Sequence, residues 1–91
     1  WYSYRASKAA LNMMLKNAAI EAQRVNRHAK FIAYHPGTVD SPLSQPFQRS
    51  VPKAKLFTPE FTALKLTEVL NTAVADGELS YVDWAGETIA W

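Results

Sequence analysis

The chain has 91 residues, of which 48% are apolar and 20% charged, with a formal net charge of +2. This composition is typical of a globular protein and excludes a disordered tail, and the length allows at most one domain. With no cysteine, a disulfide framework, a thiolate nucleophile and a sulfur-ligated metal site are excluded, which fits a cytoplasmic location. No apolar run is long enough for a membrane span, and the small net charge gives no reason to expect nucleic acid as a partner.

A long helix is expected over residues 1–26. From Tyr4 onward, apolar residues recur at the three- and four-residue steps of a helix. One stripe contains Leu11, Met14, Leu15, Ala18, Ala22 and Val25, and a second contains Ala6, Ala10, Met13 and Ile20. Two apolar faces predict a helix that is covered by its own sheet on one side and by a partner on the other.

Residues 30–35 are predicted to form a strand that ends at Pro36 and Gly37. The run is short and mostly apolar, which is typical of a strand that is buried on both faces of a parallel sheet. A helix followed by a strand is half of an α/β unit. Because nothing before this strand supplies a parallel neighbour, we expect the chain to be a piece of a longer protein.

Residues 36–57 show neither a helical nor a strand period, and they contain four of the five prolines. A loop of this length is uncommon in a compact domain and usually functional, so a lid or binding loop is favoured over a merely irregular connection.

A second helix is expected over residues 58–76. Thr58 is a hydroxyl N-cap, Pro59 fits the first helical position and Glu60 places an acid in the first turn. Gly77 is the expected stop, and residues 80–91 form a terminal strand and tail. The fold class is therefore α/β.

Chemistry is suggested by Tyr4 and Lys8, which are four residues apart at the head of the first helix. Side chains at this spacing lie on one helix face. A positive charge beside a phenol stabilises the phenolate and lowers its pKa, which makes the tyrosine a usable proton donor. The spacing alone is weak evidence, since it arises easily by chance.

Two longer segments carry a resemblance. Tyr-Arg-Ala-Ser-Lys-Ala-Ala-Leu-Asn at 4–12, followed by Pro-Gly-Thr-Val-Asp-Ser at 36–41, resembles the active-site helix and the Pro-Gly segment of the short-chain dehydrogenase/reductase family. The ending at 81–91 is similar to the terminal strand of reductases related to the C-factor signalling protein. The resemblance implies the C-terminal part of a Rossmann-like, doubly wound parallel sheet.

The family's roles are implied at the matching positions. Tyr4 would be the acid/base that reduces a carbonyl or oxidises an alcohol together with NAD or NADP, and Lys8 would lower its pKa and bind the nicotinamide ribose. Ser7 is not the catalytic serine of the family. The implied cofactor-binding residues are Tyr4, Lys8, Pro36, Gly37, Val39 and Ser41. Homo-oligomers would form through the helices at 1–26 and 58–76.

The departures from the family pattern also matter. The glycine-rich turn that holds pyrophosphate is absent, as are the family's active-site serine and asparagine. We therefore expect the chain to be inactive alone, with the nucleotide-binding half lying upstream. The alternative is a truncated, non-enzymatic module for self-association or interaction. The specificity loop at 42–57 does not reveal the substrate.

Overall fold

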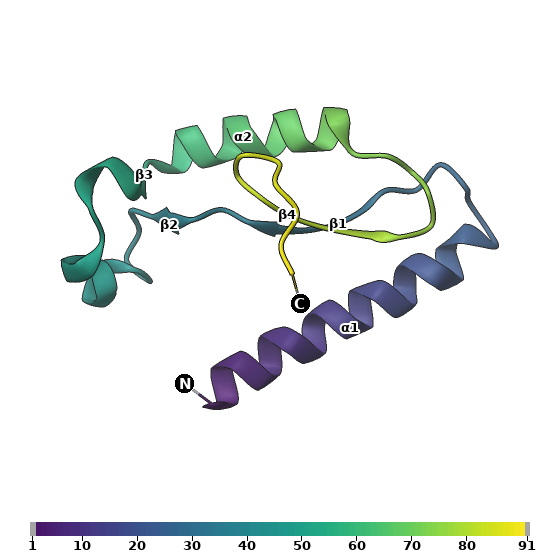
Figure 1. The fold of residues 1–91 in the computed structure, drawn as a ribbon, viewed down its shortest axis with the longest axis horizontal. Coiled ribbons are helices and arrows are strands. Elements are labelled where there is room, and N and C mark those ends of the chain that lie inside the picture. Colours follow the sequence, from purple (N-terminus) through teal and green to yellow (C-terminus); the bar gives the residue numbers. More distant parts are fainter. Residues whose placement is uncertain (1, 91) are drawn as a thin grey trace.

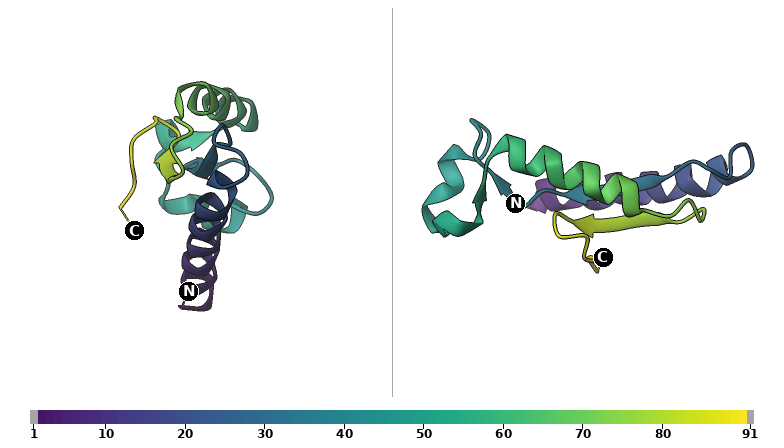
Figure 2. Two further views of the ribbon diagram at one scale, coloured as in Figure 1. Left: turned by 90° about the vertical axis from the view of Figure 1, so that its right-hand side faces the viewer. Right: turned by 90° about the horizontal axis from the view of Figure 1, so that it is seen from above.

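The computed structural model describes residues 2–90 and shows a mixed α/β fold with a small parallel sheet. Two long helices enclose the main pair of strands, one helix on each side (Figures 1 and 2). The first helix, α1, spans Tyr2–Gln23, and the second, α2, spans Pro59–Thr72. Trp1 and Trp91, the ends of the ranges predicted above, lie outside the described residues.

The central strands are β1 (Phe31–His35) and β4 (Leu79–Asp83), which pair in parallel. In their register Ala33 lies opposite Tyr81, so both residues face the same side of the sheet. The chain passes from β1 through α2 to β4, which is the βαβ connection that two parallel strands require. The predicted strand at 30–35 is therefore present, and it begins one residue later than expected.

The sheet-facing side of α1 differs in part from the predicted stripe. Leu15 and Ala22 are shielded as expected, but the most deeply buried residue is Ala19, which the stripe omitted. Met14 is 68% exposed, and Val25 is 90% exposed and lies beyond the end of α1, so neither packs on the sheet. The direction from which the sheet meets the helix decides which of two apolar faces is buried, and a periodic pattern alone does not give this direction.

The connection between β1 and α2 is more ordered than the predicted loop. It contains two short strands, β2 (Thr38–Val39) and β3 (Leu56–Phe57), which pair in parallel. Between them lie two 3-10 helices, η1 (Gln45–Ser50) and η2 (Lys53–Lys55). A pair of two-residue strands holds the two ends of the connection together, and such short elements have no period that a sequence could show.

The predicted start of α2 is confirmed, but its predicted end is not. The Thr58 hydroxyl accepts a hydrogen bond from the Phe61 N–H at 3.1 Å, and Pro59 occupies the first turn. At the other end the helix stops at Thr72, and Ala73 is already extended. Asn71 and Thr72 favour helix ends, since their side chains compete for backbone hydrogen bonds. Gly77 has a φ of +78° and serves the turn into β4 instead of ending the helix.

The outer edge of β4 is covered by the chain end. The Ile89 N–H donates to the Tyr81 carbonyl and the Asp83 N–H to the Glu87 carbonyl, both at 2.9 Å. On the other side, β1 has no strand neighbour besides β4 among the described residues. Ala33 is the one buried residue of β1, so the expectation of a strand buried on both faces was wrong for this chain. Two helices and two strands do not suffice to cover it.

The fold leaves much of its surface uncovered. The buried apolar residues of the described chain are Ala19, Ala33 and Val69. The accessible surface is 7143 Å², whereas a compact chain of this mass exposes about 5,300 Å². The radius of gyration is 14.7 Å, against about 12 Å for a compact domain of this length. The excess of about 1,800 Å² is roughly twice the ~800 Å² that one partner contributes to a standard protein–protein interface.

Neither described helix combines the length and the apolar character that crossing a membrane requires.

Candidate active site

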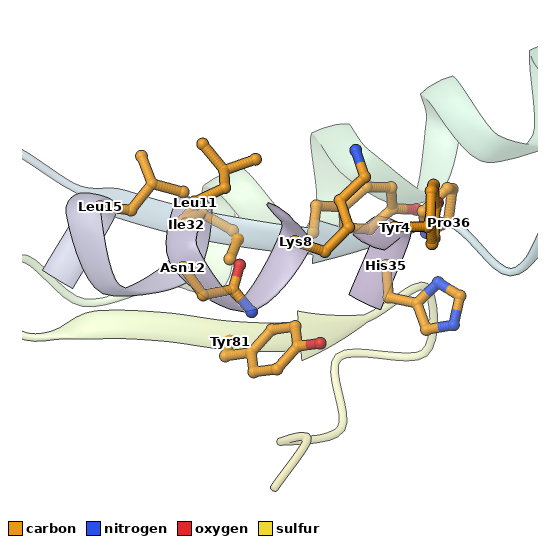
Figure 3. A pocket seen from close by; sticks show the side chains of 11 residues that line it. Tyr4, Lys8, Leu11, Asn12, Leu15, Ile32, His35, Pro36 and Tyr81 are labelled. Carbon is orange, nitrogen blue, oxygen red and sulfur yellow. The ribbon is translucent and has the colours of Figure 1, made fainter. Parts of the chain in front are cut away.

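A cavity of about 510 Å³ lies between α1 and the strand β1. Its wall combines the first half of α1 with β1 and one residue of β4 (Figure 3). The lining residues are Tyr4, Lys8, Leu11, Asn12, Leu15, Ile32, Ala33, Tyr34, His35, Pro36 and Tyr81. Because polar groups gather at the end where β1 stops, and apolar groups further along, the cavity has one polar end and one apolar end.

Tyr4 and Lys8 lie at the polar end of the cavity. Both side chains lie on the side of α1 that faces the cavity, one turn apart. The Lys8 ammonium lies over the Tyr4 ring, 5.6 Å from the ring centre, which is within cation–π range. The tyrosine side is open to a ligand, since Tyr4 is 56% exposed. The structure thus brings the pair predicted from the sequence together, with the Lys8 ammonium beside the Tyr4 ring.

Ser7 does not take part in this group. Its hydroxyl donates a hydrogen bond of 2.7 Å to the Tyr4 carbonyl oxygen, within the same helix. The hydroxyl therefore serves the first turn of α1, and Ser7 is not among the residues that line the cavity.

The carboxyl end of β1 brings His35 and Pro36 to the same end of the cavity. The Gly37 N–H donates to His35 Nδ1 at 3.3 Å, so this ring nitrogen acts as the acceptor. This bond holds the imidazole against the turn at Pro36 and Gly37. Ligands of open α/β sheets bind at this edge, and Pro36 is the predicted cofactor residue that the structure places there.

Three predicted cofactor residues, Gly37, Val39 and Ser41, do not line the cavity. Gly37 lies under the rings of Phe57 and Trp84. A Cβ atom placed on Gly37 would be 2.7 Å from Phe57 Cε2 and 3.3 Å from Trp84 Cδ1. Its φ of +75° favours glycine as well. Val39 pairs with Phe57 in the small β2–β3 ladder, and Ser41 follows in the turn before η1. These residues lead away from Tyr4 and Lys8 along β2.

Four polar residues that line the cavity, Asn12, Tyr34, His35 and Tyr81, were not predicted as site residues. Asn12 follows Lys8 by one further turn on the same face of α1, so the four-residue spacing that selected Tyr4 and Lys8 could have found it. Tyr81 reaches the cavity because β4 pairs with β1. No local pattern reveals that pairing.

Tyr34 lines the cavity with its backbone side but directs its hydroxyl to the opposite helix. That hydroxyl donates to the Thr62 carbonyl of α2 at 3.2 Å. Burial raises the pKa of the Tyr34 phenol, and the nearby carboxylates of Asp83 and Glu68 raise it further. Tyr34 therefore stays protonated and acts as a link between β1 and α2, not as a proton donor for the cavity.

No group of three or more His, Cys, Asp or Glu residues within 2–90 is placed to hold a metal ion.

Comparison of the chain with protein-family models, with curated proteins and with solved structures finds no match. Its function therefore has to be argued from the residues and geometry described above.

Proposed function

We propose that the chain is the C-terminal catalytic segment of an NAD(P)-dependent short-chain dehydrogenase/reductase. One observation carries the proposal: Tyr4 and Lys8 share a cavity with His35 and Pro36 at the carboxyl end of a parallel strand. The sequence resemblance pairs the same two segments, 4–12 and 36–41. In this reading the helix α1, the βαβ unit and the small sheet are the C-terminal part of a Rossmann-like, doubly wound sheet.

In the proposed reaction Tyr4 moves the proton. Its hydroxyl donates a proton to the oxygen of a carbonyl substrate, or accepts one from an alcohol in the reverse direction. The Lys8 ammonium lies beside the ring and stabilises the negative charge that the phenol oxygen then carries. Leu11, Leu15 and Ile32 form the apolar remainder of the cavity lining.

The chain fits only one end of a dinucleotide. When bound, the cofactor supplies or accepts the hydride. Tyr4 and Lys8 would meet the nicotinamide ribose at the open end of the cavity. For the pyrophosphate the family uses a glycine-rich turn at a helix N-terminus, and none of the three glycines stands there: Gly37 lies under Phe57, Gly77 lies against Gln23, and Gly86 lies in the turn after β4. The described chain alone therefore supplies half of a binding site.

The uncovered surface supports the same proposal. An excess of about 1,800 Å² is what a chain exposes when a large neighbouring surface normally covers it. In the proposed enzyme this neighbour is the nucleotide-binding half, which would also continue the sheet at the open edge of β1. We place the enzyme in the cytoplasm, since the chain uses no cysteine.

The test compares two proteins, the isolated chain and the longer polypeptide that we propose. NAD(P)H binding followed by fluorescence, and carbonyl-dependent oxidation of NAD(P)H, should be absent for the isolated chain and present for the longer polypeptide. Binding or turnover by the isolated 91-residue chain would contradict the proposal as stated.

A second candidate function, self-association without catalysis, is favoured by the outer face of α1. Tyr2, Met13 and Ile20 are 92%, 48% and 50% exposed, and they lie on the side of the helix opposite Leu15 and Ala19. Ala6 and Ala9 complete this outer stripe and would let a second helix approach closely. A homo-oligomer through α1, with α2 contributing Leu64 and Leu70, is compatible with either function.

A further inference from the structure

Residues 41–51, which we call the flap, fold back on themselves directly after β2. The N–H groups of Ser44 and Gln45 both donate to the Ser41 carbonyl, at 3.1 and 3.0 Å. The 3-10 helix η1 follows and ends where the Val51 N–H donates to the Gln48 carbonyl at 3.0 Å. Figure 1 shows these residues at one end of the molecule, beyond β2 and β3. The flap is thus a compact unit with its own hydrogen bonds.

The Ser44 hydroxyl joins the flap to β2. It donates to the Val39 carbonyl oxygen and accepts from the Ser41 N–H at 3.3 Å and from Gln48 Nε2 at 3.0 Å. A hydroxyl has one donor and two acceptor positions, so all of its hydrogen-bonding capacity is used. Val39 belongs to the β2–β3 ladder, which means that this one side chain ties the flap to the sheet.

Gln48 supports the same junction from the other side. Its Nε2 group donates to Asp40 Oδ1 and to Ser44 Oγ, both at 3.0 Å. Asp40 is itself held to β3, because its N–H donates to the Phe57 carbonyl at 2.8 Å. One donor position of the Gln48 amide therefore connects the flap to Asp40, directly after β2, and the other connects Gln48 to Ser44 within the flap.

Apolar packing contributes little to holding the flap in place. None of residues 41–51 is buried, and Leu43 and Phe47 are 85% and 55% exposed. A segment with few buried apolar contacts opens locally at a small cost in free energy. The hydrogen bonds of Ser44 and Gln48 are then what distinguishes the closed flap from an open one.

We propose that Ser44 and Gln48 form a latch that closes the flap on the end of β2 and keeps the Val39 carbonyl occupied. When the latch opens, the Val39 carbonyl oxygen and the Asp40 carboxylate become available to a ligand. A ligand that donates a hydrogen bond to this carbonyl from the direction of the Ser44 hydroxyl competes with that hydroxyl. Only the identity of that ligand, the carboxamide of a nicotinamide, rests on the proposed function; the latch itself does not.

The latch is tested on the 91-residue chain by amide hydrogen exchange, without any ligand. Ser44→Ala and Gln48→Ala should each speed exchange of the Ser41, Gln45 and Val51 amides by about fivefold or more, since each variant removes hydrogen bonds that hold the closed state. The amides of the α2 interior should exchange as before. In Ser44→Ala the carbonyl ¹³C resonance of Val39 should also shift, because its donor is lost.

Gln45→Ala is the matched control, since Gln45 begins the same 3-10 helix and its exposed side chain lies outside the latch. Gln48→Glu should open the flap more than Gln48→Ala does, because it sets a carboxylate against Asp40. The double variant with Asp40→Asn and Gln48→Glu should recover part of the protection of these amides from exchange. In it the amide group at position 40 can donate to the carboxylate at position 48. Unchanged exchange in both alanine variants, or equal acceleration in Gln45→Ala, would overturn the latch. Because no dinucleotide is used, neither result depends on whether the chain belongs to a dehydrogenase.

Discussion

The ammonium group of Lys8 lies 5.6 Å from the centre of the Tyr4 ring, one helical turn further along α1. In the longer, active polypeptide that we propose, Lys8→Met should lower kcat for carbonyl reduction by about 10²-fold or more, because the phenol oxygen loses the charge that stabilises it in the transition state. The assay follows carbonyl-dependent oxidation of NAD(P)H.

Lys16→Met is the control for this variant. Lys16 is on the same helix and is also exposed, but it does not line the cavity. Its loss should leave kcat within about twofold of the parent value. A Lys8→Met enzyme as active as the Lys16→Met enzyme would remove Lys8 from the proposed site.

Gly37 is predicted to tolerate alanine worse than Gly86 does. Both residues have positive φ, +75° and +81°, so each Gly→Ala change carries a backbone cost of about 1 kcal/mol. At Gly37 the new Cβ would also be 2.7 Å from Phe57 Cε2, whereas at Gly86 it would meet nothing within 4 Å. Denaturant unfolding should therefore show a loss for Gly37→Ala that exceeds the Gly86→Ala loss by about 1 kcal/mol or more. Equal losses of stability would mean that the Phe57 and Trp84 rings do not pack on Gly37.

The chain should lose stability as the pH rises above about 10, and Tyr34 should contribute to that loss. Burial raises the pKa of the Tyr34 phenol in the folded chain, with Asp83 and Glu68 adding to the effect. Between its ordinary and its raised value the unfolded chain gives up this proton while the folded chain keeps it. The unfolded state then binds fewer protons, so the free energy of unfolding falls as the pH rises.

The variant Tyr34→Phe isolates this contribution. It loses the hydrogen bond to the Thr62 carbonyl and should be less stable at neutral pH. Its free energy of unfolding should decline less steeply than that of the parent between pH 9 and 11, because one titrating group is gone. Parallel pH profiles of the two proteins, measured by urea unfolding, would contradict the account.

Met13 and Met14 allow a test of whether the outer stripe of α1 is a contact surface. Met13 lies on the stripe opposite the sheet, while Met14 lies a quarter-turn away and is 68% exposed. If copies of the chain associate through α1, Met13→Glu should raise the dimer dissociation constant by about tenfold or more, because it sets a charge in the interface. Met14→Glu should change it little. Sedimentation equilibrium gives both constants, and equal effects would exclude this stripe as the contact.

The parts of the fold that the sequence predicts are those set by local chemistry. Thr58 caps α2 because its hydroxyl reaches the Phe61 N–H three residues on, and the strand at 31–35 ends at Pro36 because proline supplies no N–H. Lys30 shows the limit of such local reasoning. Its ammonium donates to the Leu70 carbonyl in the last turn of α2, at 2.8 Å, and this partner lies 40 residues away in the sequence.

The residues of the candidate site also fall into two groups, those that a local pattern predicts and those that depend on the fold. Tyr4 and Lys8 could be found because one helix fixes their spacing, and Pro36 because it ends a strand. Gly37, Val39 and Ser41 were grouped with them on the resemblance, yet the pairing of β2 with β3 carries the chain away from the cavity. Tyr81 joins the cavity only because β4 returns beside β1. Contacts of this kind depend on residues far apart in the sequence, so no local pattern contains them.

The most direct test of the proposed function is turnover by the longer polypeptide with Tyr4→Phe, measured beside Tyr2→Phe and the isolated 91-residue chain. Tyr2 is 92% exposed and does not line the cavity, so Tyr2→Phe should reduce carbonyls as fast as the parent. Tyr4→Phe should lose about 10²- to 10⁴-fold in kcat, because the proposed proton donor is removed, and the isolated chain should show no turnover. Full activity of Tyr4→Phe, or carbonyl reduction by the isolated chain, would contradict the account.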